Sequence, residues 1–290
     1  MSNKPWKLYI DLAKLKVIIP VGLSGLTGFL LYSPSQPGNA FLLCLGVILQ
    51  AASASAINQI REKRFDSRMP RTMNRPVASG KISTGKAWIF SMLIFAAGTL
   101  LLFLLFGPLT ALLGLFSLLW YILVYTELKK ITAFAVIPGS LTGAIPPVMG
   151  WTAAGGHPGD LTAILLAFLF FMGQVPHFWL LVLKYGDQYE KAGFPALGRH
   201  FTDIQIKRLS FTWILTSFSA ALLLAFFGIM ETTLIKLALL SVVLAGIYVF
   251  RGLVIPLRNT GKDRHFLFLN LYFMALMILL IADKMIEVYA

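Results

Sequence analysis

Long apolar stretches dominate this sequence and restrict its fold more than any other feature. Each is close to the roughly 20 residues that cross the hydrocarbon core of a bilayer as an α-helix. Nine can be placed, at residues 15–32, 39–58, 86–106, 109–126, 133–153, 161–183, 209–229, 232–250 and 265–282. Hydrophobic residues make up 58% of the chain and charged residues only 13%, too few to cover a soluble globule of this size. We therefore predict an all-α integral membrane protein whose nine transmembrane helices form a single domain over residues 1–290.

The distribution of basic residues supports the count of nine. Cytoplasmic loops concentrate Lys and Arg. With a cytoplasmic amino terminus, 23 of the 25 Lys and Arg residues fall on that side, all except Lys236 and Lys284. Topology and contact with anionic head groups of the lipid bilayer thus explain the net charge of +13, and no nucleic acid partner is predicted. No cleavable signal pattern precedes the first helix, which we expect to remain. The single cysteine, Cys44, excludes an intrachain disulfide or a cysteine-based metal cluster.

The first polar cluster covers residues 58–76, at the predicted cytoplasmic end of the second helix. Asn58, Glu62 and Asp66 recur every four residues and lie along one stripe of a continuing helix. Such oxygen-bearing side chains can hold Mg²⁺, which is often bound by one or two carboxylates together with substrate phosphate oxygens. Arg71 and Arg75 follow and offer planar donors suited to phosphate. The cluster therefore favours a diphosphate ligand; the alternative is a solvated, salt-bridged loop.

A second polar cluster, residues 184–195, lies at the cytoplasmic end of the sixth helix. Like the first, it follows a long apolar helix and joins a carboxylate to basic residues, which indicates a weak internal repeat. Two such halves would bring Asp187 opposite Glu62 and Asp66, on either side of a metal-bridged diphosphate. The alternative is an ordinary helix end at which Asp187 pairs with Lys191.

The loop between the fourth and fifth helices shares this side of the membrane. Either Lys129 or Lys130 can reach the diphosphate from it, although two lysines are also expected in any short cytoplasmic loop. The following span is interrupted by small residues and prolines between Gly139 and Trp151. A helix of this kind is either closely packed or opened toward a cavity.

A central apolar cavity closed at one end by acids, metal and arginines suits a polyprenyl diphosphate, which has a hydrocarbon tail and an anionic head. Loss of diphosphate leaves an allylic carbocation, which requires a water-free pocket with aromatic faces. His177, well inside a span, can orient an acceptor, ligate a haem iron or form a hydrogen bond within the core. The aromatic candidates, each of which can equally serve in packing, are Tyr125, Phe134, Trp151, Phe178 and Trp179.

Three groups of residues together resemble the motifs of the UbiA superfamily of intramembrane prenyltransferases, over most of the chain. Within it they are most similar to the protohaem IX farnesyltransferases, also called haem O synthases. The stretch from Asn58 through Arg71-Thr72-Met73-Asn74-Arg75-Pro76 resembles the first aspartate-rich motif. Tyr125 to Lys129, with Gly143 to Trp151, resembles the central signature, and Pro176 to Trp179 with Tyr185 to Pro195 resembles the second motif.

The resemblance implies a UbiA-type prenyltransferase fold and farnesyl transfer from farnesyl diphosphate to a vinyl group of haem b, giving haem O. Mg²⁺ would assist ionisation and water would complete a hydroxyethylfarnesyl side chain. Asn58, Glu62, Asp66 and Asp187 would be the catalytic residues that hold metal and diphosphate. The diphosphate would also contact Arg71, Arg75, Lys129 and Tyr185, and the acceptor pocket would include His177 and Trp151. The expected location is the plasma (inner) membrane, with haem A synthase or terminal oxidase assembly as partners.

Several positions depart from the family pattern. Glu62 and Arg64 stand where the family has Asp, and Asp187-Gln188 replaces an acidic pair. A Lys-Pro-Arg near the first helix appears as Lys14-Leu15-Lys16, and Ala135 replaces an Asn. One carboxylate remains on each expected wall, so the ionisation chemistry is retained. The acceptor is less constrained, which leaves a quinone precursor or another aromatic acceptor as the alternative.

Two further classes of protein fit the composition. A transporter would use the charged groups for a permeating ion, but here they lie toward one membrane face and not at the midplane. A noncatalytic assembly protein of the respiratory membrane would carry the carboxylates incidentally.

Overall fold

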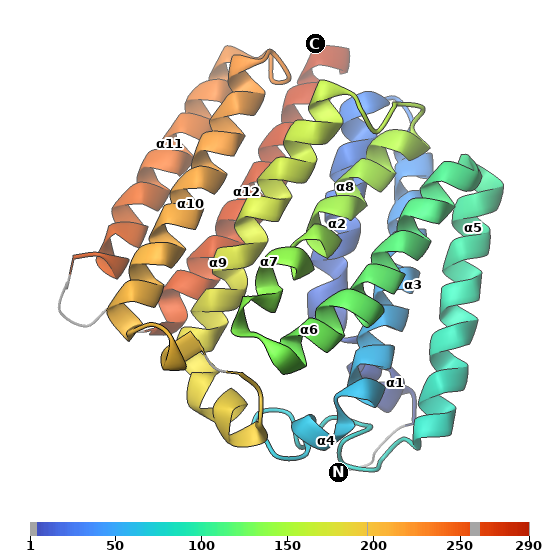
Figure 1. Ribbon diagram of the computed structural model, residues 1–290. Coiled ribbons are helices and arrows are strands. Elements are labelled where there is room, and N and C mark those ends of the chain that lie inside the picture. Colours follow the sequence, from blue (N-terminus) through green and yellow to red (C-terminus); the bar gives the residue numbers. More distant parts are fainter. Residues whose placement is uncertain (1–4, 196, 256–261, 290) are drawn as a thin grey trace.

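A computed structural model describes residues 5–195, 197–255 and 262–289, and every regular element in these ranges is helical (Figure 1). The amino-terminal half contains α1 (Pro5–Ala13), α2 (Leu15–Tyr32), α3 (Pro37–Arg61), α4 (Lys63–Asp66), α5 (Thr84–Leu119), the π-helix η1 (Trp120–Tyr125), α6 (Thr126–Ile131), the 3₁₀ turn η2 (Ala133–Ala135), α7 (Val136–Gly139) and α8 (Leu141–Ala153). The carboxy-terminal half contains α9 (Leu161–Ala192), η3 (Leu197–Arg199), α10 (Asp203–Phe226), α11 (Thr233–Phe250), η4 (Arg251–Leu253) and α12 (Lys262–Tyr289).

Nine membrane crossings can be traced through the described residues. Eight helical segments are long and apolar enough to span a bilayer, and one of them, Thr84–Ile131, is 48 residues long. This segment reverses at Gly107, whose φ of 82° and ψ of 176° are not helical, and Pro108 starts the return helix. It therefore contributes two crossings, as predicted from the Gly-Pro pair. Helix α1 and the end of α12 accordingly lie at opposite ends of the bundle (Figure 1).

Several details of the bundle differ from the predicted spans. The fifth span is not one helix but three short pieces, η2, α7 and α8, and α9 extends nine residues beyond its predicted end, to Ala192. The amino-terminal basic segment also forms a separate helix, α1. Lys4 and Arg258, two of the basic residues used for the topology, lie outside the described residues.

Two apolar cores hold the helices together. One joins α9 to α10, α11 and α12, with Leu166, Leu169 and Phe218 fully or almost fully buried. The other joins α2, α3, α5 and α8 around Phe29 and Met149. Large apolar side chains on the outside of the bundle remain exposed, as expected for a surface that faces lipid.

The broken fifth span packs closely against the first. A Cβ at Gly150 of α8 would lie 1.9 Å from the carbonyl oxygen of Gly25, and a Cβ at Gly28 of α2 would lie 1.9 Å from that of Pro147. Close backbone approach through small residues is a common mode of helix association in membranes. The sequence predicted that this glycine-rich span is either closely packed or opened toward a cavity, and close packing applies to this end of α8.

A Gly150→Ala variant is expected to be less stable by about 1–3 kcal/mol or more, because the added methyl group forces α2 and α8 apart. Gly38→Ala is the matched control, since no atom lies within 4 Å of the position that its Cβ would take and its effect should stay within about 0.5 kcal/mol. Thermal unfolding in detergent micelles measures both. Equal midpoints for the two variants would contradict the packing described here.

Candidate functional site

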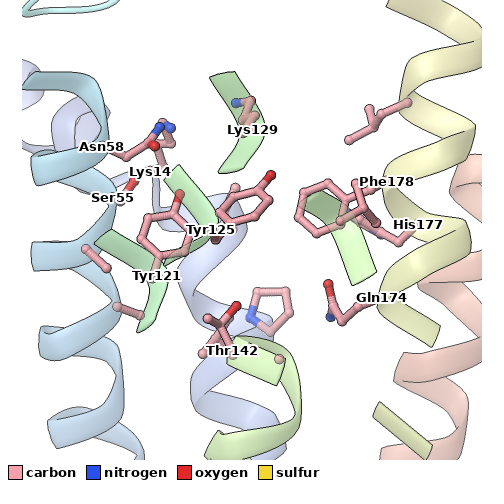
Figure 2. A pocket seen from close by; sticks show the side chains of 18 of the residues that line it. Lys14, Ser55, Asn58, Tyr121, Tyr125, Lys129, Thr142, Gln174, His177 and Phe178 are labelled. Carbon is pink, nitrogen blue, oxygen red and sulfur yellow. The ribbon is translucent and has the colours of Figure 1, made fainter. Parts of the chain in front are cut away.

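A cavity of about 890 Å³ lies between the two apolar cores, and its lining includes residues from the end of the bundle where α1, α4 and α6 lie (Figure 1). Apolar and aromatic side chains from α2, α3, α5, α8, α9 and α12 form most of its wall. Charged side chains gather at one end, around Asn58, Lys14 and Lys129 (Figure 2). The cavity therefore combines an apolar chamber with a charged mouth, as predicted.

The predicted stripe on the first motif is present. Asn58 lies at the end of α3, Glu62 at the junction with α4 and Asp66 at the end of α4, and all three line the cavity. They are 5%, 2% and 0% exposed. The Asn58 side-chain amide donates to Glu62 Oε2 at 3.1 Å, whereas Asn58 Oδ1 is buried without a hydrogen-bond partner among the described residues. This excludes the solvated-loop alternative, because three buried oxygen-bearing groups face one chamber.

Each buried carboxylate is paired with one cation. Lys129 Nζ donates to Glu62 Oε1 at 2.9 Å, and Arg75 Nη1 donates to both oxygens of Asp66 at 2.6 and 2.7 Å. Burial by itself would raise the pKa of Glu62, but Lys129 outweighs this effect and holds that pKa below its usual value. Glu62 can therefore remain ionised in an apolar surrounding. Arg75 and Lys129 line the cavity beside these two acids.

Lys130 is not part of this site. Its Nζ donates to both oxygens of Glu127 at 2.8 and 3.0 Å, and Arg61 pairs with the same carboxylate. These contacts link α6 to the end of α3 outside the cavity. Of the two lysines, Lys129 lines the cavity and Lys130 does not.

Arg71 and Tyr185 also line the cavity, as expected. The Arg71 guanidinium lies 4.9 Å from the centroid of the Tyr185 ring, and its Nη2 donates to the Tyr189 hydroxyl at 2.9 Å. The first motif is therefore joined to the end of α9 through an arginine held between two tyrosines.

Asp187 is not brought opposite Glu62 and Asp66, and this corrects the expectation of a second carboxylate wall. It is exposed and is not among the residues that line the cavity. The reason is helical geometry: α9 continues to Ala192, and Tyr185 and Tyr189, four residues apart, face the cavity. Asp187 lies about 200° around the helix from both of them. The helical repeat of 3.6 residues predicts this orientation of Asp187 once Tyr185 and Tyr189 are taken as the face toward the cavity.

His177 lines the cavity and Trp151 does not. The His177 ring lies 4.7 Å from that of Phe266, and Gln174 and Asn270 line the same region. Trp151 instead donates its indole N–H to Asp160 Oδ2 at 2.8 Å, near the opposite end of the bundle. This hydrogen bond holds the pKa of Asp160 below its usual value. The assignment of Trp151 to an acceptor pocket is therefore wrong, because its polar atom serves the loop between α8 and α9.

The aromatic side chains that line the cavity include Tyr121, Tyr125 and Phe178 (Figure 2). Tyr121 and Tyr125 both lie on the π-helix η1, with ring centroids 5.4 Å apart, and Phe178 lies 5.8 Å from Tyr125. Tyr121 had not been predicted from the sequence. Of the other aromatic candidates, Phe134, Trp151 and Trp179 do not line the cavity.

Lys14 was also missed as a site residue, because a basic residue before the first helix is expected from topology alone. It lines the charged mouth between α1 and α2. Burial and nearby Arg75 together lower its pKa to about 7, although Glu62 and Asp66 oppose the shift. An ammonium group in this position is stabilised by an additional anion.

The oxygen donors of the first motif fit one Mg²⁺ ion. Asn58 Oδ1 is a buried acceptor without a partner, and Glu62 and Asp66 add hard carboxylate oxygens on the same stripe. Such an ion usually takes one or two carboxylates and completes its shell with water and phosphate oxygens. No group of three or more His, Cys, Asp or Glu that could form an all-protein metal site occurs in the described residues. The site therefore suits a metal that arrives with a phosphate ligand.

Comparison with known proteins agrees with the architecture of an intramembrane prenyltransferase. The UbiA prenyltransferase family matches residues 21–276, and the chain belongs to this family. It is 38% identical to a protoheme IX farnesyltransferase of Geobacter sulfurreducens, over 72% of this chain and 77% of the relative. It is 36% identical to the protoheme IX farnesyltransferase of Teredinibacter turnerae, over 96% of this chain and 90% of the relative. A UbiA homolog from Archaeoglobus fulgidus, solved with GPP and Mg²⁺, has a similar fold with a TM-score of 0.67 at 14% identity, covering 94% of this chain and 99% of that one.

Proposed function

We propose that this protein transfers the farnesyl group of farnesyl diphosphate to a vinyl group of haem b and so forms haem O. The observation that carries the reaction class is the charged mouth on an apolar cavity of about 890 Å³, where buried acids and cations meet. The relatives support the choice of haem b as acceptor and of farnesyl diphosphate as donor. They are protoheme IX farnesyltransferases, and this chain matches them over most of their length.

The first step breaks the bond between C1 of the farnesyl group and the bridging oxygen, and the diphosphate leaves with both electrons. Arg71, Arg75 and Lys129 neutralise the charge that develops on the leaving group. Mg²⁺, held by Asn58, Glu62 and Asp66, would supply further Lewis-acid stabilisation of the phosphate oxygens. The faces of Tyr121, Tyr125 and Phe178 then stabilise the allylic cation.

The second step joins the two substrates. The π electrons of the haem vinyl group form a bond to C1 of the farnesyl cation, which places the positive charge on the vinyl carbon next to the porphyrin. Water adds to that carbon and loses a proton, which gives the hydroxyethylfarnesyl side chain. His177, Gln174 and Asn270 line the cavity away from the acids and are proposed to orient the acceptor.

The proposed location is the plasma (inner) membrane, with the amino terminus and the charged mouth on the cytoplasmic side. The support is the excess of Lys and Arg in the loops at that end of the bundle. Haem A synthase or a terminal oxidase under assembly is the proposed recipient of the product.

Incubation of the purified protein with Mg²⁺, haem b and farnesyl diphosphate tests the proposal. Mass spectrometry is expected to detect a haem whose mass has increased by one farnesyl group and one hydroxyl group. Parallel reactions replace haem b with a hydroxybenzoate or a naphthoate. A prenylated product with one of these acceptors and none with haem would overturn the acceptor, and no release of diphosphate with any acceptor would overturn the reaction class.

A further inference from the structure

The charged mouth of the cavity carries more positive than negative side chains. Two carboxylates line it, Glu62 and Asp66, and each is paired with one cation. The cationic residues that line the cavity are Lys14, Lys16, Arg71, Arg75 and Lys129. A net excess of three positive charges at the entrance of an apolar chamber attracts a multiply charged anion.

Lys14 is the most distinctive of the surplus cations. Lys16 is exposed, and Arg71 donates to the Tyr189 hydroxyl and lies against two tyrosine rings. Lys14 lies among Arg75, Glu62, Asp66 and Lys129, and Figure 2 shows it beside Asn58, facing the region of Lys129. Within the described residues its amino group makes no hydrogen bond and no ion pair. An ammonium group held in this way has capacity to bind an anion.

The backbone at Lys14 adopts a conformation that lysine rarely takes. Its φ of 57° and ψ of 61° are left-handed, and among the described residues no other non-glycine residue has a positive φ. Such outliers persist where the surrounding structure fixes them, and they cluster at ligand sites. A glycine would suit this junction between α1 and α2 better, so the lysine side chain must have another use.

The junction is fixed from the side of the first motif. The buried Gln59 donates from Nε2 to the carbonyl oxygens of Asp11 and Leu12, at 3.3 and 3.1 Å. Leu12 is fully buried, and Gln59 is the neighbour of Asn58 in α3. The position of Lys14 is therefore set by the same turn of helix that presents Asn58.

We propose that Lys14 is a substrate-binding residue for the diphosphate, a further cation that contacts it besides Arg71, Arg75 and Lys129. This inference rests on the proposed prenyl transfer, because it assigns a further ligand of the same leaving group. The strained junction between α1 and α2 holds the amino group opposite Lys129, and the diphosphate binds between the two.

Isothermal titration calorimetry of inorganic diphosphate binding in Mg²⁺ buffer tests the role of Lys14 without turnover. Lys14→Gln is expected to weaken binding about 10- to 100-fold, the effect of losing one charge-assisted hydrogen bond. It should raise KM for farnesyl diphosphate and leave KM for haem b unchanged. The matched control is Lys7→Gln, since Lys7 is an exposed lysine of α1 that does not line the cavity. It should bind diphosphate as the parent does.

A second variant separates binding from folding. Lys14→Gly relieves the left-handed backbone and removes the amino group, so it should unfold at a temperature no lower than the parent while binding diphosphate as weakly as Lys14→Gln. Unchanged diphosphate binding in both Lys14 variants, or a raised KM for haem b alone, overturns the assignment. A parent protein that binds no diphosphate and releases none from farnesyl diphosphate overturns the proposed function as well.

Discussion

An Asp66→Asn variant is expected to lose roughly 10²–10³-fold in kcat for the release of diphosphate from farnesyl diphosphate, the scale of removing one preorganised electrostatic group from a buried site. Asp66 is fully buried, accepts two hydrogen bonds from Arg75 and offers a carboxylate to the proposed metal. The amide that replaces it is neutral, binds Mg²⁺ more weakly and leaves Arg75 without its counter-charge. Steady-state release of diphosphate at several Mg²⁺ concentrations measures the loss, which should be accompanied by a higher Mg²⁺ requirement.

Asp187→Asn is the matched control for Asp66→Asn. Both substitutions replace an aspartate that lies in a segment resembling a family motif. Asp187, however, is exposed and does not line the cavity. We expect Asp187→Asn to change kcat less than tenfold, with an unfolding temperature equal to that of the parent. Comparable losses in the two variants would contradict the site described here and would restore a second carboxylate wall. Full activity of Asp66→Asn would contradict the role of the first motif.

Lys129→Met is expected to reduce both stability and activity. Lys129 is the cation paired with Glu62, whose side chain is 3% exposed, so its loss leaves a buried carboxylate without a partner. Removing one member of a buried pair costs about 3–5 kcal/mol. The same change removes a donor for the diphosphate and should raise KM for farnesyl diphosphate. Thermal unfolding and initial rates are the two measurements.

A double variant distinguishes these two effects of Lys129. Glu62→Gln combined with Lys129→Met removes both charges and should recover most of the lost stability, since no unpaired ion remains. It should not recover turnover, because a carboxylate and a phosphate donor are both missing. Lys130→Met is the control for the single change, as Lys130 pairs with the exposed Glu127 outside the cavity. A Lys129→Met protein as stable as the parent would contradict the buried pair.

The crossings of the membrane were predictable because each depends on local sequence. A run of about 20 apolar residues is sufficient to define a spanning helix, and the Gly107-Pro108 pair defines a reversal whatever lies nearby. The fifth span was predicted as a single helix and consists of η2, α7 and α8. Where a helix with many small residues and prolines breaks depends on its neighbours, here the backbone of α2 against α8.

The stripe of Asn58, Glu62 and Asp66 was predictable for a similar reason, since residues four apart on a helix share a face. The same rule holds for α9. Tyr185 and Tyr189 form its cavity-facing stripe, which places Asp187 on the opposite side. The weak internal repeat and the family motif both suggested a role for Asp187 that its position on the helix does not support.

By itself, the sequence determined the all-helical membrane fold, the side on which the basic residues gather and the composition of the first motif, because hydrophobic length, loop charge and helical period are local properties. Only the tertiary structure decided which cation pairs with which acid, that Lys129 and not Lys130 enters the cavity, and that Lys14 joins it from the start of the chain. These pairings depend on the packing of helices far apart in sequence. The charges were therefore visible in the sequence, but their partners were not.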